Sequence, residues 1–310
     1  MGGPRKAHAL AALFAGAVAI GTSALFVKVS ETGPVATAFW RVALALPVLW
    51  TWAWATDRRA GIGARGASPE TRRMMVWAGA FFAGDLAVWH WSIILTSIAT
   101  ATLLANLAPL FVALAAWLLF RRPPGAGFAG ALALALAGMM LLVQGDFGAT
   151  GHAWLGDVLG VITAMFYAAY QITVNRVRAQ ASTARIMAWS SAVTAVLLAP
   201  VVWLSGETWL PMTGGGWLKL VGLALIAQAG GQSLIAYALA HLSAVFASVG
   251  LLLQPVVAGV LAWLLLGEAL SASQLAGALL VLAGIAAARY AEQGRPSKAG
   301  NERELQDQQD

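Results

Sequence analysis

The chain has 310 residues, of which 60% are hydrophobic and only 10% are charged, whereas soluble domains carry about 25% charged residues. The mean hydropathy of +0.75 and the net charge of +6 exclude a soluble globular domain, and the absence of cysteine from the sequence excludes disulfides and thiolate metal sites. The basic residues lie in short segments between apolar runs, where they set membrane topology and form no stripe for nucleic acid.

Apolar runs of about 20 residues recur along the chain, and each is long enough to cross a hydrocarbon core of about 30 Å as an α-helix. The first run could be mistaken for a signal peptide, but more membrane sequence follows it, so we expect it to remain as the first span. We place ten spans at about 8–29, 34–55, 74–96, 98–120, 125–143, 154–176, 185–204, 216–238, 243–266 and 272–290.

The sequence contains an internal repeat. The segment Ser97 to Gly138 recurs as Ser243 to Gly284 at a constant offset of 146 residues, so that a proline, a tryptophan and a glycine fall in one register. We therefore divide the chain into a first repeat of residues 1–146 with five spans, a second repeat of residues 147–291 with five spans, and a polar tail of residues 292–310 that is expected to be disordered.

Five spans is an odd number, so the two halves must enter the membrane from opposite sides. The predicted fold class is an all-α polytopic membrane protein with ten transmembrane helices arranged as two inverted five-helix repeats. Inverted repeats are typical of secondary transporters, whose substrate site lies at the repeat interface near the midplane.

The distribution of basic residues predicts the orientation. With the N-terminus in the cytoplasm, the inner segments hold nearly all Lys and Arg residues outside the spans, and the outer segments hold only Lys28 and Lys219. Arg41 lies within the second span. The positive-inside rule then places both termini in the cytoplasm and the protein in the inner (cytoplasmic) membrane.

Motifs of the second half carry a resemblance to a known family. They are Ala236-Tyr237-Ala238-Leu239, Leu253-Gln254-Pro255-Val256 and Leu266-Gly267-Glu268, followed by Gly277 and Gly284. This half resembles the EamA repeat of the drug/metabolite transporter superfamily, and the first half is similar more loosely through Pro109, Trp117 and Gly138. The sequence departs from the family at Arg121-Arg122-Pro123, where members usually have Gly-Glu-Arg. The resemblance implies a ten-helix exporter of amino acids or other metabolites, with aromatic amino-acid exporters as the nearest analogue.

The third span carries an acid in mid-membrane. A charged residue there costs about 2.5–3.5 kcal/mol on insertion scales, so Asp85 should face a cavity or a partner. Phe82, Asp85 and Trp89 lie on one helical face. The alternatives for Asp85 are lining the transport pathway and a purely structural hydrogen bond to a neighbouring helix.

Polar residues of four further spans extend this predicted site. They either line a cavity or belong to ordinary core packing. They are Thr102 and Asn106 in the fourth span, Tyr167, Tyr170 and Gln171 in the sixth, Gln228 and Gln232 in the eighth, and Ser248 and Gln254 in the ninth. Pro109 and Pro255 are repeat-equivalent and are expected to kink their helices, which would expose backbone carbonyls to a substrate or serve structure alone.

The spans are expected to form two groups, those that line the cavity and those that support the fold. We expect spans 1, 3, 4, 6, 8 and 9 to form the cavity wall. The fifth and tenth spans, with small residues seven apart, are expected to brace the fold, either within the chain or at a dimer contact.

The sequence carries none of the common catalytic motifs and no spacing typical of a metal site. We therefore expect that the protein is not an enzyme and that it binds neither a cofactor nor a metal ion. Two function classes remain open, a secondary transporter and a membrane scaffold that binds partners without transport. The expected partners are a small-molecule substrate such as an amino acid and the lipid bilayer, with protons as an open alternative, no nucleic acid, and a monomer or weak dimer.

The predicted wall combines aromatic rings and neutral amides with one acid and no base, which argues against phosphorylated or polyanionic cargo. Desolvation favours the neutral form of a carboxyl group. Asp85 would therefore either carry a proton during transport or orient the amine of the substrate.

Overall fold

A computed structural model of the chain describes residues 3–59, 67–96, 98–121, 125–143, 153–267 and 271–293. Of the tail of residues 292–310 that was predicted to be disordered, residues 292 and 293 are helical, and residues 294–310 lie outside this part. The regular elements of the described residues are helical. They are α1 (Gly3–Gly21), α2 (Ser23–Lys28), α3 (Pro34–Ala43), α4 (Leu46–Arg59), α5 (Pro69–Leu95), α6 (Ile98–Ala105), α7 (Ala108–Phe120), α8 (Ala126–Val143), α9 (Ala153–Val177), α10 (Thr183–Ser205), α11 (Gly214–Leu223), η1 (Ala224–Gln232), α12 (Ser233–Ala238), α13 (Ala244–Gly250), α14 (Leu253–Leu266) and α15 (Ala272–Gln293).

These helices are built to lie in a membrane. Among the described residues, 8 helical stretches are long and apolar enough to cross one, and α8 is a shorter apolar helix. α5 is also long enough, with 27 residues. The ten predicted spans all fall on these elements, several of which are divided in two, and the prediction of an all-α polytopic membrane protein is confirmed.

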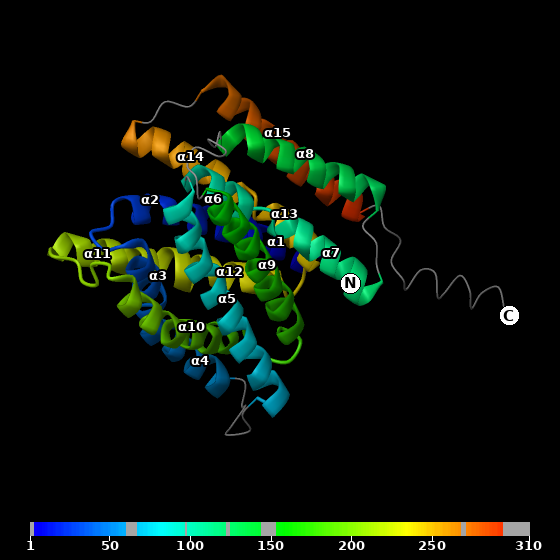
Figure 1. Cartoon of the computed structure of the whole chain (residues 1–310). Helices are drawn as coiled ribbons and strands as arrows, with labels where there is room; N and C mark the ends of the chain where they lie inside the picture. The colour runs from blue at the N-terminus through cyan, green and yellow to red at the C-terminus, as the bar shows by residue number, and fades with distance from the viewer. Residues whose placement is uncertain are drawn as a thin grey trace.

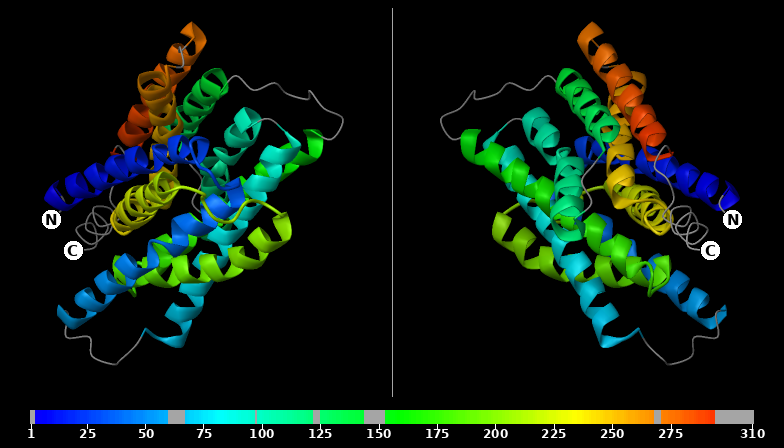
Figure 2. Two further views of the ribbon diagram at one scale, coloured as in Figure 1. Left: turned by 90° about the vertical axis from the view of Figure 1, so that its left-hand side faces the viewer. Right: turned by 90° about the vertical axis from the view of Figure 1, so that its right-hand side faces the viewer.

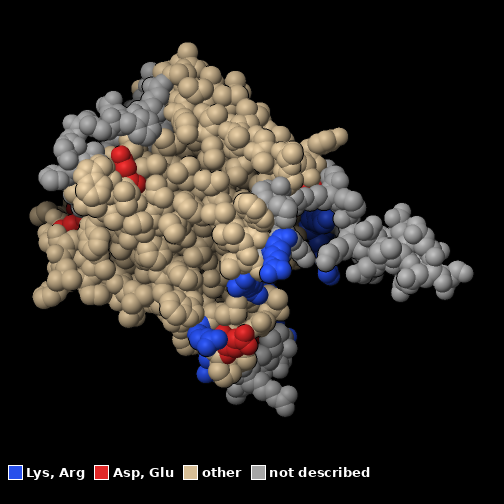
Figure 3. Space-filling model, turned by 45° about the vertical axis from the view of Figure 1, so that its right-hand side comes forward, with Lys and Arg blue, Asp and Glu red and all other residues tan. Residues whose placement is uncertain are grey.

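The outer surface of the helices is apolar, as lipid contact requires. Leu118 and Leu119 of α7 are 66% and 63% exposed, and their repeat counterparts Leu264 and Leu265 of α14 are 61% and 62% exposed. In Figure 3 most of the visible surface belongs to uncharged residues, and the Lys and Arg side chains gather in the lower right of the view.

The repeat is visible in the helices themselves. An offset of 146 residues carries α1–α2 onto α9, α3–α4 onto α10, α5 onto α11–η1–α12, and α8 onto α15. It also carries the division between α6 and α7 onto the division between α13 and α14. Each half therefore repeats one sequence of five helical spans.

The divided spans break for a local chemical reason. Pro109 and Pro255 have no backbone N–H, so the helix loses one hydrogen bond in the turn before each of them. The chain tightens there into three-residue turns, with Leu107 N donating to Leu104 O at 3.0 Å and Leu252 N to Val249 O at 3.0 Å. Ala105 ends α6 and Gly250 ends α13 at the two breaks.

α8 and α15 lie side by side at one edge of the molecule (Figures 1 and 2). Their contact depends on small residues, because a Cβ atom on Gly138 would lie 2.6 Å from Val281 N and 2.7 Å from Gly277 O. The small-residue stripe therefore serves packing within the chain, which is one of the two alternatives that the sequence left open.

This contact gives a stability prediction. Gly138→Ala should lower the thermal stability of the detergent-solubilised protein, by about 1–3 kcal/mol, because the new methyl group overlaps backbone atoms of α15. Gly130 lies on the same helix with nothing within 4 Å of the position of its Cβ, so Gly130→Ala is a matched control. Equal melting temperatures for the two variants would contradict close packing of α8 on α15.

Candidate functional site

Two ionisable side chains of opposite kind, a carboxyl and a guanidinium group, lie at the centre of the helices. Asp85 projects from the middle of α5, and Arg41 from the last turn of α3. The two charges are close enough to attract one another, and protein atoms surround both. Each side chain nevertheless keeps part of its surface accessible, which fits groups that face an internal space.

The guanidinium of Arg41 is held by groups other than Asp85. Its Nε donates to Gln228 Oε1 at 3.1 Å, and its Cζ lies 5.9 Å from the centre of the Phe82 ring, a distance at which a cation is attracted to an aromatic face. Gln228 in turn donates to Ser191 Oγ at 3.0 Å. In the described part of the chain no hydrogen bond joins Arg41 to Asp85, so the two terminal guanidinium nitrogens are left for another acceptor.

A stack of aromatic rings continues from this charge pair. The rings of Phe82 and Tyr170 lie 4.9 Å apart at an interplanar angle of 28°, and those of Tyr167 and Tyr170 lie 6.1 Å apart at 14°. Tyr167 also lines a small cavity together with Gln254 of α14. The stack thus runs from α5 across α9 to the broken ninth span.

A small cavity of about 20 Å³ lies where the two broken spans meet α9. This volume is large enough for about one water molecule. Its lining comes from both repeats, with Ala105, Asn106, Ala108 and Pro109 from the first and Tyr167, Gln171, Ser248, Leu251, Leu252 and Gln254 from the second.

Several amide groups, two of them in the cavity lining, are unusual because they are buried without a protein partner. Among the described residues, both side-chain amide atoms of Gln171, Nε2 of Gln254 and Oε1 of Gln232 have none, and Gln171 and Gln232 are each 1% exposed. A buried polar group without a hydrogen bond costs about 1–3 kcal/mol. These amides can therefore form hydrogen bonds with the polar groups of a bound small molecule.

The sequence model of the EamA-like transporter family matches residues 7–144 and 154–290. The chain belongs to the EamA-like transporter family.

Further comparisons agree with this assignment. A protein of Archaeoglobus fulgidus named "uncharacterized transporter" is 27% identical to this EamA-like transporter over 192 residues, which cover 61% of the chain and 66% of the relative, just under two thirds of its length. A crystal structure is similar over 93% of the chain and 99% of its own chain, with a TM-score of 0.78 and 19% identity. The second similarity shows the fold alone.

Arg41 belongs to this group of side chains, although it was not among the residues predicted for the site. We expected a wall with one acid and no base, and this is wrong because Arg41 of the second span lies against Phe82 and bonds Gln228. The rule that singled out Asp85, that a charge within a span needs a functional or structural partner, applies equally to Arg41. The second span of the EamA-like transporter therefore contributes Arg41 to the group of side chains around Phe82 and Gln228.

The other predicted residues take different places. Tyr170 is only 2% exposed, and its hydroxyl donates to Met187 Sδ at 3.9 Å, so its ring forms the middle of the stack while its hydroxyl is bound within the core. Thr102 turns its carbonyl oxygen to Asn106, accepting from Asn106 Nδ2 at 2.8 Å. Ser248 donates to Val245 O at 2.8 Å and still lines the cavity.

Trp89 and Gln232 are also outside the cavity lining. Trp89 lies one turn beyond Asp85 on α5 and is partly buried. Gln232 ends η1, a π-helical segment of 9 residues. Segments of this kind occur frequently at functional sites, and η1 is what presents Gln228 to Arg41.

Proposed function

We propose that this EamA-like transporter exports small zwitterionic amino acids across the cytoplasmic membrane. The observation that carries the proposal is the pair of opposite charges, Arg41 and Asp85, at the centre of the helices. A free amino acid carries a carboxylate and an ammonium group on one carbon. Arg41 would bind the carboxylate through its two free terminal nitrogens, as guanidinium groups do, and Asp85 would bind the ammonium.

The surroundings of the pair support a small and partly apolar cargo. Phe82 and Tyr167 offer aromatic faces to a side chain, and Gln171 and Gln254 offer amide groups that lack protein partners. The pair has no net charge and provides one base, which argues against phosphorylated or polyanionic cargo.

Transport is proposed to proceed by alternating access. The two repeats bring equivalent broken spans, α6–α7 and α13–α14, to one central cavity. Rocking of one repeat against the other about such a site would expose it to each side of the membrane in turn.

The runner-up is a membrane scaffold that binds partners and moves no solute. Uptake and efflux of labelled amino acids in proteoliposomes containing the purified protein separate the two. We expect movement above that of empty liposomes, with saturation at high substrate concentration. If no amino acid moves in either direction, the scaffold takes the place of the exporter.

The proposed orientation places both termini in the cytoplasm. A reporter enzyme fused after Asp310 should therefore be active if it works only in the cytoplasm, because the basic segments such as Arg58-Arg59 hold their ends of the helices inside. The control is a fusion at the same position to a reporter enzyme that is active only outside the cytoplasm, and this fusion should be inactive. Activity of that second reporter would contradict the orientation.

A further inference from the structure

The two ends of the molecule carry contacts that join the repeats. At one end, the loop between α2 and α3 meets the loop between α10 and α11. The carboxylate of Glu31 accepts from Met212 N at 3.0 Å, Thr213 N at 3.1 Å and Thr213 Oγ1 at 2.6 Å. We call this the Glu31 end.

A second carboxylate strengthens the Glu31 end. Glu207 Oε2 accepts from Val35 N at 2.9 Å and from Ala36 N at 3.1 Å, at the N-terminus of α3. Free N–H groups at a helix N-terminus attract a negative charge. Trp40 Nε1 also donates to Trp209 O at 2.7 Å, so three side chains hold the two repeats together here.

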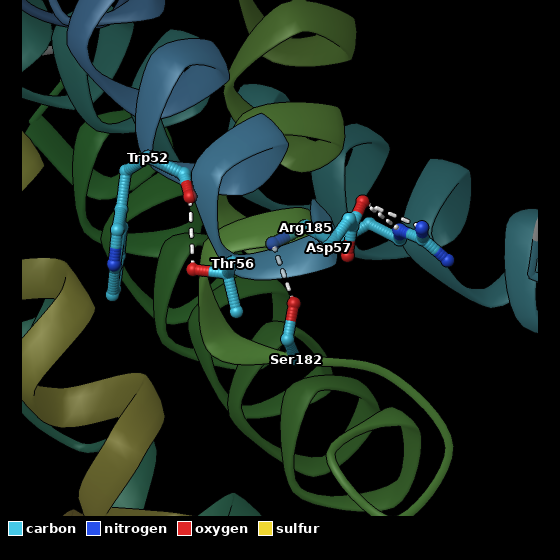
Figure 4. Close-up of polar contacts among 5 residues, drawn as sticks. All are labelled: Trp52, Thr56, Asp57, Ser182 and Arg185. Carbon is cyan, nitrogen blue, oxygen red and sulfur yellow. Dashed lines mark hydrogen bonds and ion pairs between the residues drawn. The ribbon is translucent and has the colours of Figure 1, made fainter. Parts of the chain in front are cut away.

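At the opposite end of the spans, α4 and α5 meet the loop between α9 and α10. Arg185 donates through Nε and a terminal nitrogen to Asp57 Oδ2, at 3.1 and 2.6 Å (Figure 4). Thr71 Oγ1 donates to Gln180 Oε1 at 2.7 Å. We call this the Asp57 end.

The contacts at the two ends are related by the repeat. At each end, a side chain from the loop after the first span of one half binds the start of the third span of the other half; these are Glu31 with Thr213 and Gln180 with Thr71. At each end, too, an acid from the region after the second span of one half binds the start of the second span of the other half. These are Glu207 with Val35 and Ala36, and Asp57 with Arg185.

The third spans even begin alike at the two ends. Thr213 caps α11 by accepting from Gly216 N, and Ser68 caps α5 by accepting from Thr71 N. The offset of 146 places Thr213 one residue before Ser68. Contacts so alike at opposite ends are what two inverted copies of one half would make.

We propose that these two sets of contacts are the paired gates of the transporter, of which one opens while the other stays closed. The inference rests on the alternating access proposed above and names the residues that position the repeats in each state. Glu31 and Glu207 hold one gate. Asp57 and Gln180 hold the other through Arg185 and Thr71.

The strength of the contacts suits gates that open reversibly. Arg185 and Asp57 keep 17% and 22% of their side-chain surface exposed, and ion pairs that remain partly in water contribute little. Asp57, Thr71, Gln180 and Arg185 also line a surface hollow of about 690 Å³, so water can replace the contacts as they separate.

Glu31 is ionised at neutral pH. Its hydrogen bond from the Thr213 hydroxyl, then those from the Thr213 and Met212 amides and the charge of Lys219, lower its pKa below the ordinary value, although desolvation opposes them. The contact is therefore complete above the ordinary pKa of a glutamate and is lost as the pH falls through the lowered one. At neutral pH the contacts of Glu31 can therefore form, and this gate can close.

The chain contains no cysteine, so a single introduced thiol reports access to the centre. Ser248→Cys places one in the cavity lining with little change of size. In membrane vesicles of both orientations, an impermeant maleimide reagent measures the labelling rate of this thiol from each side. Asp57→Ala should raise the rate from the Asp57 side about two- to fivefold, the effect of losing one partly exposed ion pair, and lower it from the other side.

The reciprocal variant and two controls complete the design. Glu31→Ala should raise labelling from the Glu31 side and lower it from the Asp57 side. Asp57→Arg combined with Arg185→Asp should return both rates to those of the parent. Glu70→Ala, which removes an acid from the same hollow but none of these contacts, should leave both unchanged.

Rates that rise from both sides together, or that do not change in either variant, would overturn the proposal, because both show that the contacts do not set which side is open. The assay needs no substrate. If the labelling pattern holds and no amino acid is transported, the assignment of the substrate fails while the gates stand.

Discussion

Replacing Arg41 by glutamine should abolish transport of amino acids. The substitution removes the only described cation at the central site and leaves Asp85 without an opposite charge. In the proposed complex Arg41 and the substrate carboxylate form a buried, hydrogen-bonded charge pair. Losing one partner of such a pair costs about 2–5 kcal/mol, which corresponds to a loss of at least about 30-fold in substrate affinity. The measurement is the concentration dependence of labelled amino-acid counterflow in proteoliposomes.

Two further variants show why transport is lost. Arg58→Gln removes an arginine from the last turn of α4, where the Arg58 Cζ lies 3.8 Å from the centre of the Trp54 ring, and should change counterflow less than twofold, in keeping with the small contribution of exposed charges. Arg41→Gln combined with Asp85→Asn removes both charges. Its melting temperature should therefore be higher than that of Arg41→Gln alone, while transport should stay lost. Normal counterflow in Arg41→Gln would contradict a role for Arg41 in binding.

Asp85→Asn has the second large expected effect. If Asp85 binds the substrate amine, its amide replacement should lose counterflow and transport driven by an imposed pH gradient to the same extent. An acid that carries a proton would lose driven transport and keep counterflow. We expect the first result, because Arg41 and Asp85 together match the two charges of an amino acid.

Either of the other results would change the account in a definite way. If the variant keeps counterflow and loses transport driven by the pH gradient, Asp85 carries the coupled proton. The substrate amine would then have no binding partner in this account. If Asp85→Asn keeps both activities, Asp85 is structural and its assignment to the substrate is wrong.

The spans and their repeat could be predicted from the sequence because both depend on local composition. Apolar runs give the length of each span, and Pro109 and Pro255 mark the same break in each half. The observed divisions between α6 and α7 and between α13 and α14 follow the offset of 146 residues. Packing of α8 on α15 through Gly138 also follows from small residues in a fixed register.

The composition of the site was predicted only in part. Gln171 and Gln254 could be selected as polar groups inside spans, and both line the cavity. Arg41 was left out although Thr37 lies four residues before it in the same span, and its closeness to Asp85 depends on how α3 packs on α5. Tyr170 is the opposite case. It was predicted to line the cavity, but its ring packs in the core and its hydroxyl donates to Met187.

The contacts at the two ends could not be predicted from the sequence at all. Glu31 and Thr213 are 182 residues apart, and Asp57 and Arg185 are 128 residues apart. Each of these residues looks like an ordinary loop or helix-end residue in isolation. Their pairing follows from the docking of the two repeats, which the inverted topology implies only in outline.

Recognition of a zwitterion by two opposite charges is the central claim, and competition in a counterflow assay tests it most directly. Proteoliposomes with the wild-type transporter are loaded with unlabelled amino acid, and uptake of the labelled form is measured with three competitors of similar size. These are the amino acid itself, the carboxylic acid that lacks its amine, and the amine that lacks its carboxylate. We predict that only the complete amino acid competes strongly; equal competition by either single-charge analogue would contradict the claim.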